Sequence, residues 1–159
     1  MNKECSHGSL VSINVSPKGG VPKTPTNNAI IRTMGIVGDS QADKKHHGGI
    51  DKAICIYSDE IINILKEEGH PINQGTTGEN LTLKGIKWNE LSIGDTIAIG
   101  EVFLRLTMTA TPCSTIKNSF MEGNFNRISD KNFPGFSRWY ASVEREGIVE
   151  LGDLVIHSK

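Results

Sequence analysis

Short runs of β-branched residues, each entered through a Gly-Asp turn, constrain the fold of this chain more than any other feature. The segments IGDTIAIG (93–100) and LGDLVIHS (151–158) share this unit, and VGD (37–39) is a fainter relative. Glycine permits a positive φ at such a turn, and the aspartate carboxylate caps the turn. This repeated unit predicts a chain of many short strands.

Other segments add strands to this pattern. VFLRLTM (102–108) alternates apolar residues with others, which is typical of a half-buried strand. SLVSINV (9–15), NAIIRTMGIVGD (28–39) and KAICIYS (52–58) predict further strands. The sequence therefore predicts a mainly β (α+β), barrel-like fold with two or three short helices, and an α/β sandwich is the alternative. The short connections argue against parallel βαβ architecture.

Two helices are expected from capping and periodicity. Ser58 is the predicted N-cap of the first helix, because Asp59 and Glu60 follow it at the positive end of the helix dipole. Gly69 supplies the C-terminal stop. The second expected helix lies in 136–147, where four apolar residues fall at helical spacing: Phe136, Trp139, Tyr140 and Val143.

Size and composition favour one soluble domain of 159 residues, with 1–8 as a flexible N-terminus and 9–159 as the folded part. The chain has 17 Lys and Arg against 18 Asp and Glu, which gives no electrostatic case for nucleic acid or an anionic membrane as partner. No segment approaches the length of a membrane span, and residues 1–15 have no apolar run long enough for the core of a signal peptide, so no secretory signal is expected. Three widely spaced cysteines do not form a disulfide framework, so a cytoplasmic protein is expected.

Cys113 is the first candidate for a residue with a chemical role. It follows the alternating strand in the segment TATPC, where Pro112 ends the pairing. Nearby hydroxyls, backbone N–H groups and Lys117 are expected to stabilise a thiolate, which is the reactive form of a thiol. The alternative is a small buried residue, the commonest state of a free cysteine.

Cys55 lies between two isoleucines of a predicted strand, and we interpret it as structural.

Three polar loops are further candidates. KKHHGGIDKA (44–53) carries two histidines that point to opposite sides of an extended chain, so one shared metal is not favoured. Its glycine pair suits an anion-binding loop, and a solvated surface turn is the alternative. Lys23 in GVPK suits a fixed anion, and TTGENL (76–81) begins a strand. A barrel gathers such loops at one mouth.

With these residues in place, the chain resembles the MOSC family, named after the C-terminal domain of molybdenum-cofactor sulfurases. The similarity is to the stand-alone bacterial type, and it implies a β-rich barrel. It rests on seven segments in order: SPKGGVPKTP, GIVGDSQADKKHHGGIDKA, IYSDEI, GTTGENLTLKGI, LSIGDTIAIG, LTMTATPC and GIVELGD.

The resemblance implies binding of the molybdenum cofactor, a pterin dithiolene with a phosphate tail. It places the family cysteine at Cys113, as a molybdenum ligand or as a persulfide sulfur carrier. A reductase of N-hydroxylated compounds with a separate electron donor is one implied activity, and a non-catalytic cofactor carrier is the alternative. Cofactor contacts are implied for Lys23, Asp39, His47, Gly48, Gly49, Glu79, Asn80, Thr111, Ser114 and Arg138.

One position departs from the family pattern. Many members have arginine three residues before the cysteine, where this chain has Ala110. Either Lys117 or Arg138 substitutes for that guanidinium, or the ligand of this protein differs from the family norm. The pyridoxal-phosphate domain of complete sulfurases does not fit in this chain, so no pyridoxal phosphate site is expected. The implied partners are an electron donor or a cofactor-biosynthesis protein.

Two alternative functions that do not involve the molybdenum cofactor also stay open. The first is a thiol enzyme in which Cys113 is the nucleophile and His46 or His47 is the base. The second is a β domain whose loops bind another protein.

Overall fold

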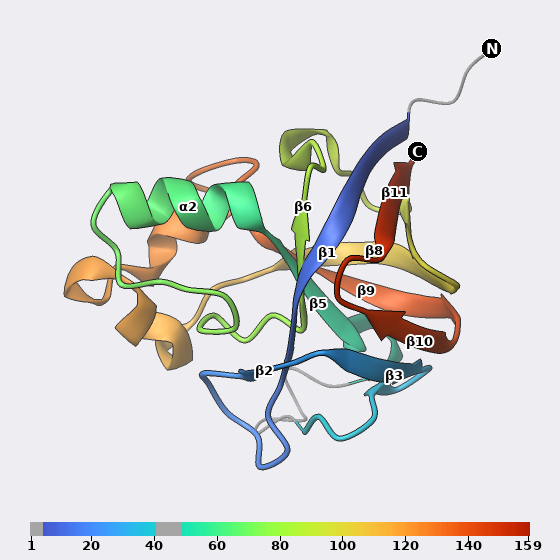
Figure 1. Ribbon diagram of the computed structural model, residues 1–159. Helices are drawn as coiled ribbons and strands as arrows, with labels where there is room; N and C mark the ends of the chain where they lie inside the picture. The colour runs from blue at the N-terminus through green and yellow to red at the C-terminus, as the bar shows by residue number, and fades with distance from the viewer. Residues whose placement is uncertain (1–4, 41–48) are drawn as a thin grey trace.

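The computed structural model describes residues 5–40 and 49–159 and shows a closed β-barrel with one α-helix beside it (Figure 1). Seven strands follow one another in the order β11-β7-β8-β9-β5-β6-β1, and pairing of β11 with β1 closes the ring. The prediction of a mainly β, barrel-like fold is confirmed. The barrel strands are β1 (Cys5–Val15), β5 (Ile54–Ser58), β6 (Leu81–Lys84), β7 (Thr96–Ile99), β8 (Val102–Ala110), β9 (Arg138–Arg145) and β11 (Leu154–Ser158).

Four short strands complete the β structure of the described residues. β2 (Thr24–Thr26) extends the barrel sheet beyond β1. A separate three-stranded sheet has the order β10-β3-β4, formed by β10 (Gly147–Glu150), β3 (Asn28–Arg32) and β4 (Gly35–Ile36). Ile31 and Val149 of this small sheet are fully buried in the same apolar core as the barrel interior. The small sheet therefore packs its apolar face against the barrel.

The predicted Gly-Asp turns are present before β7 and β11. Gly94 and Gly152 have φ values of 92° and 90°, a region that favours glycine. Asp95 Oδ2 accepts a hydrogen bond of 3.0 Å from the Ser92 N–H. Asp153 Oδ2 accepts one of 2.8 Å from the Glu150 N–H. Local turn chemistry thus sets the entry of both strands.

The helix α2 (Asp59–Glu67) begins where the sequence predicts it. Ser58 Oγ caps it by accepting a hydrogen bond of 3.2 Å from the Ile61 N–H. The helix joins β5 to β6, and those two strands pair in parallel. One βαβ unit therefore exists against the expectation from short connections, because this connection is long enough to hold a helix.

The prediction of a helix within 136–147 is wrong, because that segment contains β9. The strand lies between β8 and β5, and its first half is buried on both faces, whereas its last two residues are exposed. Trp139 packs in the main core, whereas Tyr140 packs in a small separate cluster with Cys55 and Ala110. A strand buried on both faces loses its two-residue alternation, so its apolar residues can fall at helical spacing by coincidence.

The N-terminal strand begins at Cys5 rather than at residue 9, so the predicted flexible segment 1–8 is too long. Residues 5–8 pair with β11, from Cys5 opposite Ser158 to Gly8 opposite Val155. These pairs close the barrel, so residues 5–8 belong to the barrel sheet. Residues 1–4 lie outside the described part of the chain.

Helical turns of the 3-10 type fill the connection from β8 to β9. They span Ser114–Ser119, Met121–Gly123 and Phe125–Ile128, and they lie on the same side of the barrel as α2 (Figure 1). The Met121 N–H donates a hydrogen bond of 3.0 Å to His70 Nδ1, and Arg127 forms an ion pair of 2.7 Å with Glu68. These contacts hold the segment after Cys113 against the end of α2. Two further 3-10 turns are Ile50–Lys52 and Trp88–Glu90.

Candidate functional site

A pocket lies where four loops meet β5 and the beginning of β9. The loops precede β2 and β6 and follow β4 and β8, so they come from distant parts of the sequence. Four of the residues predicted for the site line this pocket: Lys23, Asn80, Cys113 and Arg138. The barrel therefore brings these four residues, from distant parts of the sequence, to one pocket.

Cys113 follows β8 and has an extended backbone, with φ of −140° and ψ of 174°. Its side chain lines the pocket and is half-buried, so its sulfur is accessible to a ligand. Cys113 Sγ lies 2.9 Å from Thr115 Oγ1, within hydrogen-bond distance. Thr115 also lines the pocket and was not predicted as a site residue. The only sequence signal for it was the hydroxyl-rich run that follows the cysteine.

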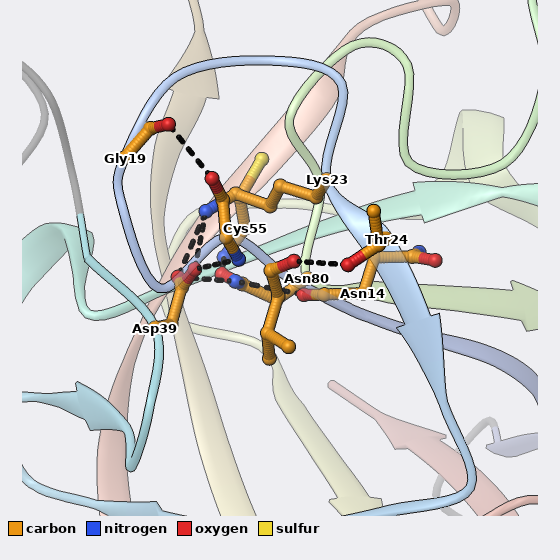
Figure 2. Close-up of polar contacts among 9 residues, drawn as sticks. Asn14, Gly19, Lys23, Thr24, Asp39, Cys55 and Asn80 are labelled. Carbon is orange, nitrogen blue, oxygen red and sulfur yellow. Dashed lines mark hydrogen bonds and ion pairs between the residues drawn. The ribbon is translucent and has the colours of Figure 1, made fainter.

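Lys23 and Asp39 form a buried ion pair at the edge of the pocket (Figure 2). Lys23 Nζ lies 2.8 Å from each carboxylate oxygen of Asp39. Asp39 also accepts a hydrogen bond of 2.7 Å from the Ser16 N–H and one of 2.9 Å from Asn80 Nδ2. Figure 2 shows Lys23 and Asn80 pointing toward the Asp39 carboxylate. The charge of Lys23 is therefore balanced within the protein.

Asn80 ties the pocket wall to the sheet. Its Oδ1 accepts a hydrogen bond of 3.0 Å from the Cys55 N–H, and its own N–H donates one of 2.8 Å to the Cys55 carbonyl. Its carbonyl accepts a hydrogen bond of 2.7 Å from the Asn14 N–H. Asn80 is therefore a positioning residue for β5, β1 and the Asp39 carboxylate, and its side chain is committed to these contacts.

The loop before β6 approaches the Lys23 backbone closely. The Lys23 N–H donates a hydrogen bond of 2.9 Å to the Gly75 carbonyl. Gly75 has a φ of 81°, and a Cβ at this position would lie 2.6 Å from the Lys23 carbonyl oxygen. Only glycine fits there, which fixes the GVPK loop against the TTGENL segment.

Arg138 is the first residue of β9 and lies directly opposite Ala110 of β8. Its side chain is buried, with a relative exposure of 6 %. Its Nη1 donates a hydrogen bond of 2.7 Å to the Thr77 carbonyl. Its Nε is buried and has no hydrogen-bond partner among residues 5–40 and 49–159. Arg138 also has no ion pair with a carboxylate of that part of the chain.

Cys55 and Tyr140 form the apolar floor of the pocket. They are cross-strand partners on β5 and β9, and they cluster with Ala110. Burial raises the pKa of the Cys55 thiol to about 11 and also raises the pKa of Tyr140. Cys55 is buried in a strand as predicted, but its place in the pocket was not foreseen. The pairing that puts it there is not visible in a single sequence.

Several other predicted site residues do not line this pocket. Glu79 is fully buried and accepts hydrogen bonds from the Gly75 N–H at 3.1 Å and Thr77 Oγ1 at 2.9 Å. Burial raises the pKa of its carboxyl. The remaining described ones are exposed and outside the pocket lining: Gly49, Thr111, Ser114 and the alternative cation Lys117. Predictions for His46, His47 and Gly48 fall outside the described residues.

Residues 5–40 and 49–159 contain no group of three or more His, Cys, Asp or Glu residues that could hold a metal ion. Within the same ranges, no helix has the length and apolar character needed to cross a membrane.

The order of these segments and the barrel that they form agree with one domain family. The MOSC domain profile matches residues 43–156, which is most of the chain. The chain belongs to the MOSC domain family. The chain is 30 % identical over 135 residues to the uncharacterized protein YflK of Bacillus subtilis. It is 28 % identical over 124 residues to protein YiiM of Escherichia coli. These matches cover 84 % and 76 % of this chain but only 60 % and 54 % of those relatives.

Two solved structures have the same fold as this chain. The crystal structure of YiiM from Geobacillus stearothermophilus superposes with a TM-score of 0.70 at 27 % identity, over 96 % of this chain and 75 % of that one. The YUAD protein from Bacillus subtilis superposes with a TM-score of 0.76 over 99 % of this chain and 100 % of that one. Its sequence identity is 18 %, so this likeness concerns the fold alone.

Proposed function

We propose that the pocket binds the molybdenum cofactor and that Cys113 supplies the sulfur, either as a ligand of the metal or as a persulfide carrier. The observation that supports the proposal most strongly is that a thiol and a buried cation line the same pocket. Cys113 offers an accessible thiol, and Arg138 offers a buried cation without a carboxylate partner among the described residues. Membership of the MOSC family supports the same assignment.

The residues of the pocket fit an anionic ligand that contains a soft metal. A thiolate is a soft donor and suits such a metal. The unpaired Nε of Arg138 suits an anionic group. The floor of Cys55 and Tyr140 suits the flat face of a pterin ring. When bound, the cofactor would supply a metal able to change its oxidation state.

The protein's own contribution begins at the Cys113 thiol, which must lose its proton before it binds metal or carries sulfur. The Thr115 hydroxyl lies 2.9 Å from Sγ and can donate a hydrogen bond to the thiolate. The ion pair of Lys23 with Asp39 keeps the GVPK loop in place beside it. These residues hold the sulfur at a fixed position in the pocket.

The proposal has an enzymatic form and a carrier form. In the enzymatic form, an N-hydroxylated compound takes two electrons and two protons and becomes the amine plus water, with electrons from a separate protein. In the carrier form, the chain protects or delivers the cofactor to a biosynthesis partner. Ala110 in place of the family arginine favours the carrier form, because one anion-binding group is absent from β8.

The cofactor content of purified protein tests the proposal. The chain is expressed in cells with intact cofactor synthesis, and molybdenum and pterin are measured on wild type and on Cys113→Ser. We expect near-equimolar molybdenum and pterin in wild type and a large loss of metal in the variant. Cys5→Ser in β1 is the matched control and should keep both. Wild-type protein that retains neither molybdenum nor pterin would overturn the proposal.

A reductase assay separates the two forms. Cofactor-loaded protein is mixed with an artificial electron donor and several hydroxylamines, and amine formation is measured. Turnover that is lost in Cys113→Ser supports the enzyme. Loaded protein that is inactive toward every hydroxylamine, yet passes its cofactor to an acceptor apoenzyme, supports the carrier.

A further inference from the structure

The small sheet β10-β3-β4 has one buried face and one exposed face. Ala29, Ile31 and Val149 are buried against the barrel core. Ile30 and Ile148 alternate with them along the strands, and these two side chains are 42 % and 57 % exposed. The sheet lies on the side of the barrel away from α2 (Figure 1), so that helix does not cover its outer face.

Three apolar side chains form a row across this outer face. Ile148 of β10 lies directly opposite Ile30 of β3. On the other side of β3, Ile31 pairs with Ile36. This register places Val37 opposite Ile30, and the Val37 N–H donates a hydrogen bond of 2.9 Å to the Ile30 carbonyl. Residues directly opposite each other project to the same face about 5 Å apart. Val37 is 52 % exposed, so the apolar row is exposed along its whole length.

Charged side chains lie on either side of the apolar row. Arg32 is two residues after Ile30 on β3, so it projects from the same face at one end of the sheet. Glu150 is two residues after Ile148 on β10, which runs antiparallel to β3, so it projects at the other end. Both side chains are exposed, and neither forms an ion pair within residues 5–40 and 49–159. The face therefore has an apolar centre, a cation at one end and an anion at the other.

This arrangement is complementary to itself. A two-fold axis parallel to the sheet and perpendicular to its strands stacks two copies face to face and brings their apolar rows together. The same axis brings Arg32 of each copy to the end where Glu150 of the other copy lies, displaced by one strand spacing of about 5 Å. Within one copy the two residues are separated by about 13 Å along the strands, so their charges can be paired only between copies.

From this geometry we infer that the chain forms a symmetric dimer through the outer face of the small sheet. Ile148, Ile30 and Val37 form the centre of the interface, and two ion pairs of Arg32 with Glu150 form its ends. A three-stranded sheet offers a small area compared with permanent dimers, so the association is reversible and depends on protein concentration. The inference goes beyond the proposed function and does not depend on the cofactor pocket.

Sedimentation equilibrium of the purified chain, from micromolar to millimolar concentration, tests the inference. We expect the mass of the wild type to rise from monomer to dimer as the concentration increases. Ile30→Ser removes the centre of the apolar row, and we expect it to dimerise at least about tenfold more weakly. Thermal unfolding of each variant checks that the fold is retained, which is expected because the substituted positions are exposed.

Charge reversal tests the assigned pairing. Arg32→Glu and Glu150→Arg each convert two attractions into two repulsions, so either variant alone should dimerise at least about tenfold more weakly. An equimolar mixture of the two variants should dimerise as wild type does, because each mixed dimer again brings opposite charges together at both ends. The matched control Lys84→Glu reverses an exposed charge at the end of β6 and should dimerise as wild type does.

Three outcomes overturn the inference. A wild type that stays monomeric at every concentration does so, and it favours a different protein as the occupant of this face. A dimer that is equally stable in Ile30→Ser and in both charge-reversal variants shows that another surface forms the contact. Folded charge-reversal variants that stay monomeric when mixed contradict the pairing of Arg32 with Glu150 across the two-fold axis.

Discussion

Two of the buried polar clusters in the described part of this barrel differ in how completely their members are paired. Below the Gly-Asp turn of β7, Asp95 Oδ2 lies 2.7 Å from His157 Nε2 and accepts the Ser92 N–H at 3.0 Å. His157 Nδ1 lies 3.4 Å from Ser6 Oγ. In the pocket, by contrast, Arg138 Nε has no partner in the described residues. A complete cluster indicates a structural role, and an incomplete one beside an accessible thiol indicates a ligand site.

The largest expected effect is on the complete cluster. Asp95→Ala leaves His157 buried without its partner and removes the cap of the turn. We expect a loss of about 3–5 kcal/mol in the free energy of unfolding, the usual result of removing one partner of a buried pair. Urea unfolding measures it, and phosphate affinity of the folded variant should be unchanged. A loss below about 1 kcal/mol would remove the distinction between the clusters.

The next effect concerns the charge balance of the pocket. Asp39→Asn removes the carboxylate that neutralises Lys23 and keeps the acceptor for the Ser16 N–H. We expect phosphate to bind about tenfold more tightly, because a second cation becomes available to the anion. Isothermal titration measures this change, with Asp59→Asn at the half-buried start of α2, outside the pocket lining, as the matched control. Unchanged affinity in Asp39→Asn would show that Lys23 does not reach the anion.

A smaller effect on stability is expected at Arg138. Arg138→Met replaces a buried cation with an apolar chain of similar length, and such replacements are often close to neutral. We expect the free energy of unfolding to change by less than about 1 kcal/mol, while phosphate binding is lost. Urea unfolding at matched pH measures the stability. A loss as large as that of Asp95→Ala would make Arg138 a structural residue and contradict the comparison.

The smallest effect is a pH dependence from Glu79. Burial raises the pKa of this carboxyl above its unfolded value of about 4.3, so the folded state keeps the proton longer than the unfolded state. This group therefore makes the protein less stable as the pH rises from about 4.3 through the folded pKa. The stability difference between wild type and Glu79→Gln, measured by urea unfolding across that range, should change with pH. A constant difference would contradict the assigned environment.

The sequence predicts those parts of the fold that depend on nearby residues. The Ser58 cap uses a group three residues away, and the Asp95 and Asp153 caps also act across three residues. The alternating pattern of 102–108 likewise predicts β8 from its own residues. Such features were accessible because turn, cap and strand chemistry is local.

The parts that were missed depend on cross-strand partners. β9 resembled a helix because its first half is buried on both faces, which no local pattern reveals. Cys55 lines the pocket because it pairs with Tyr140, and Arg138 faces the space left by Ala110. Lys23 was expected to be available for an anion, yet Asp39 from a later loop balances its charge. Register between distant strands decides these contacts.

The most direct measurement of the central claim is X-ray absorption at the molybdenum edge of cofactor-loaded protein. It counts the sulfur atoms around the metal in wild type and in Cys113→Ser. We expect wild type to show one sulfur more than the dithiolene pair supplies, and the variant to lose that sulfur or the metal itself. An unchanged molybdenum content together with an unchanged sulfur shell in Cys113→Ser would contradict the claim that Cys113 binds the metal.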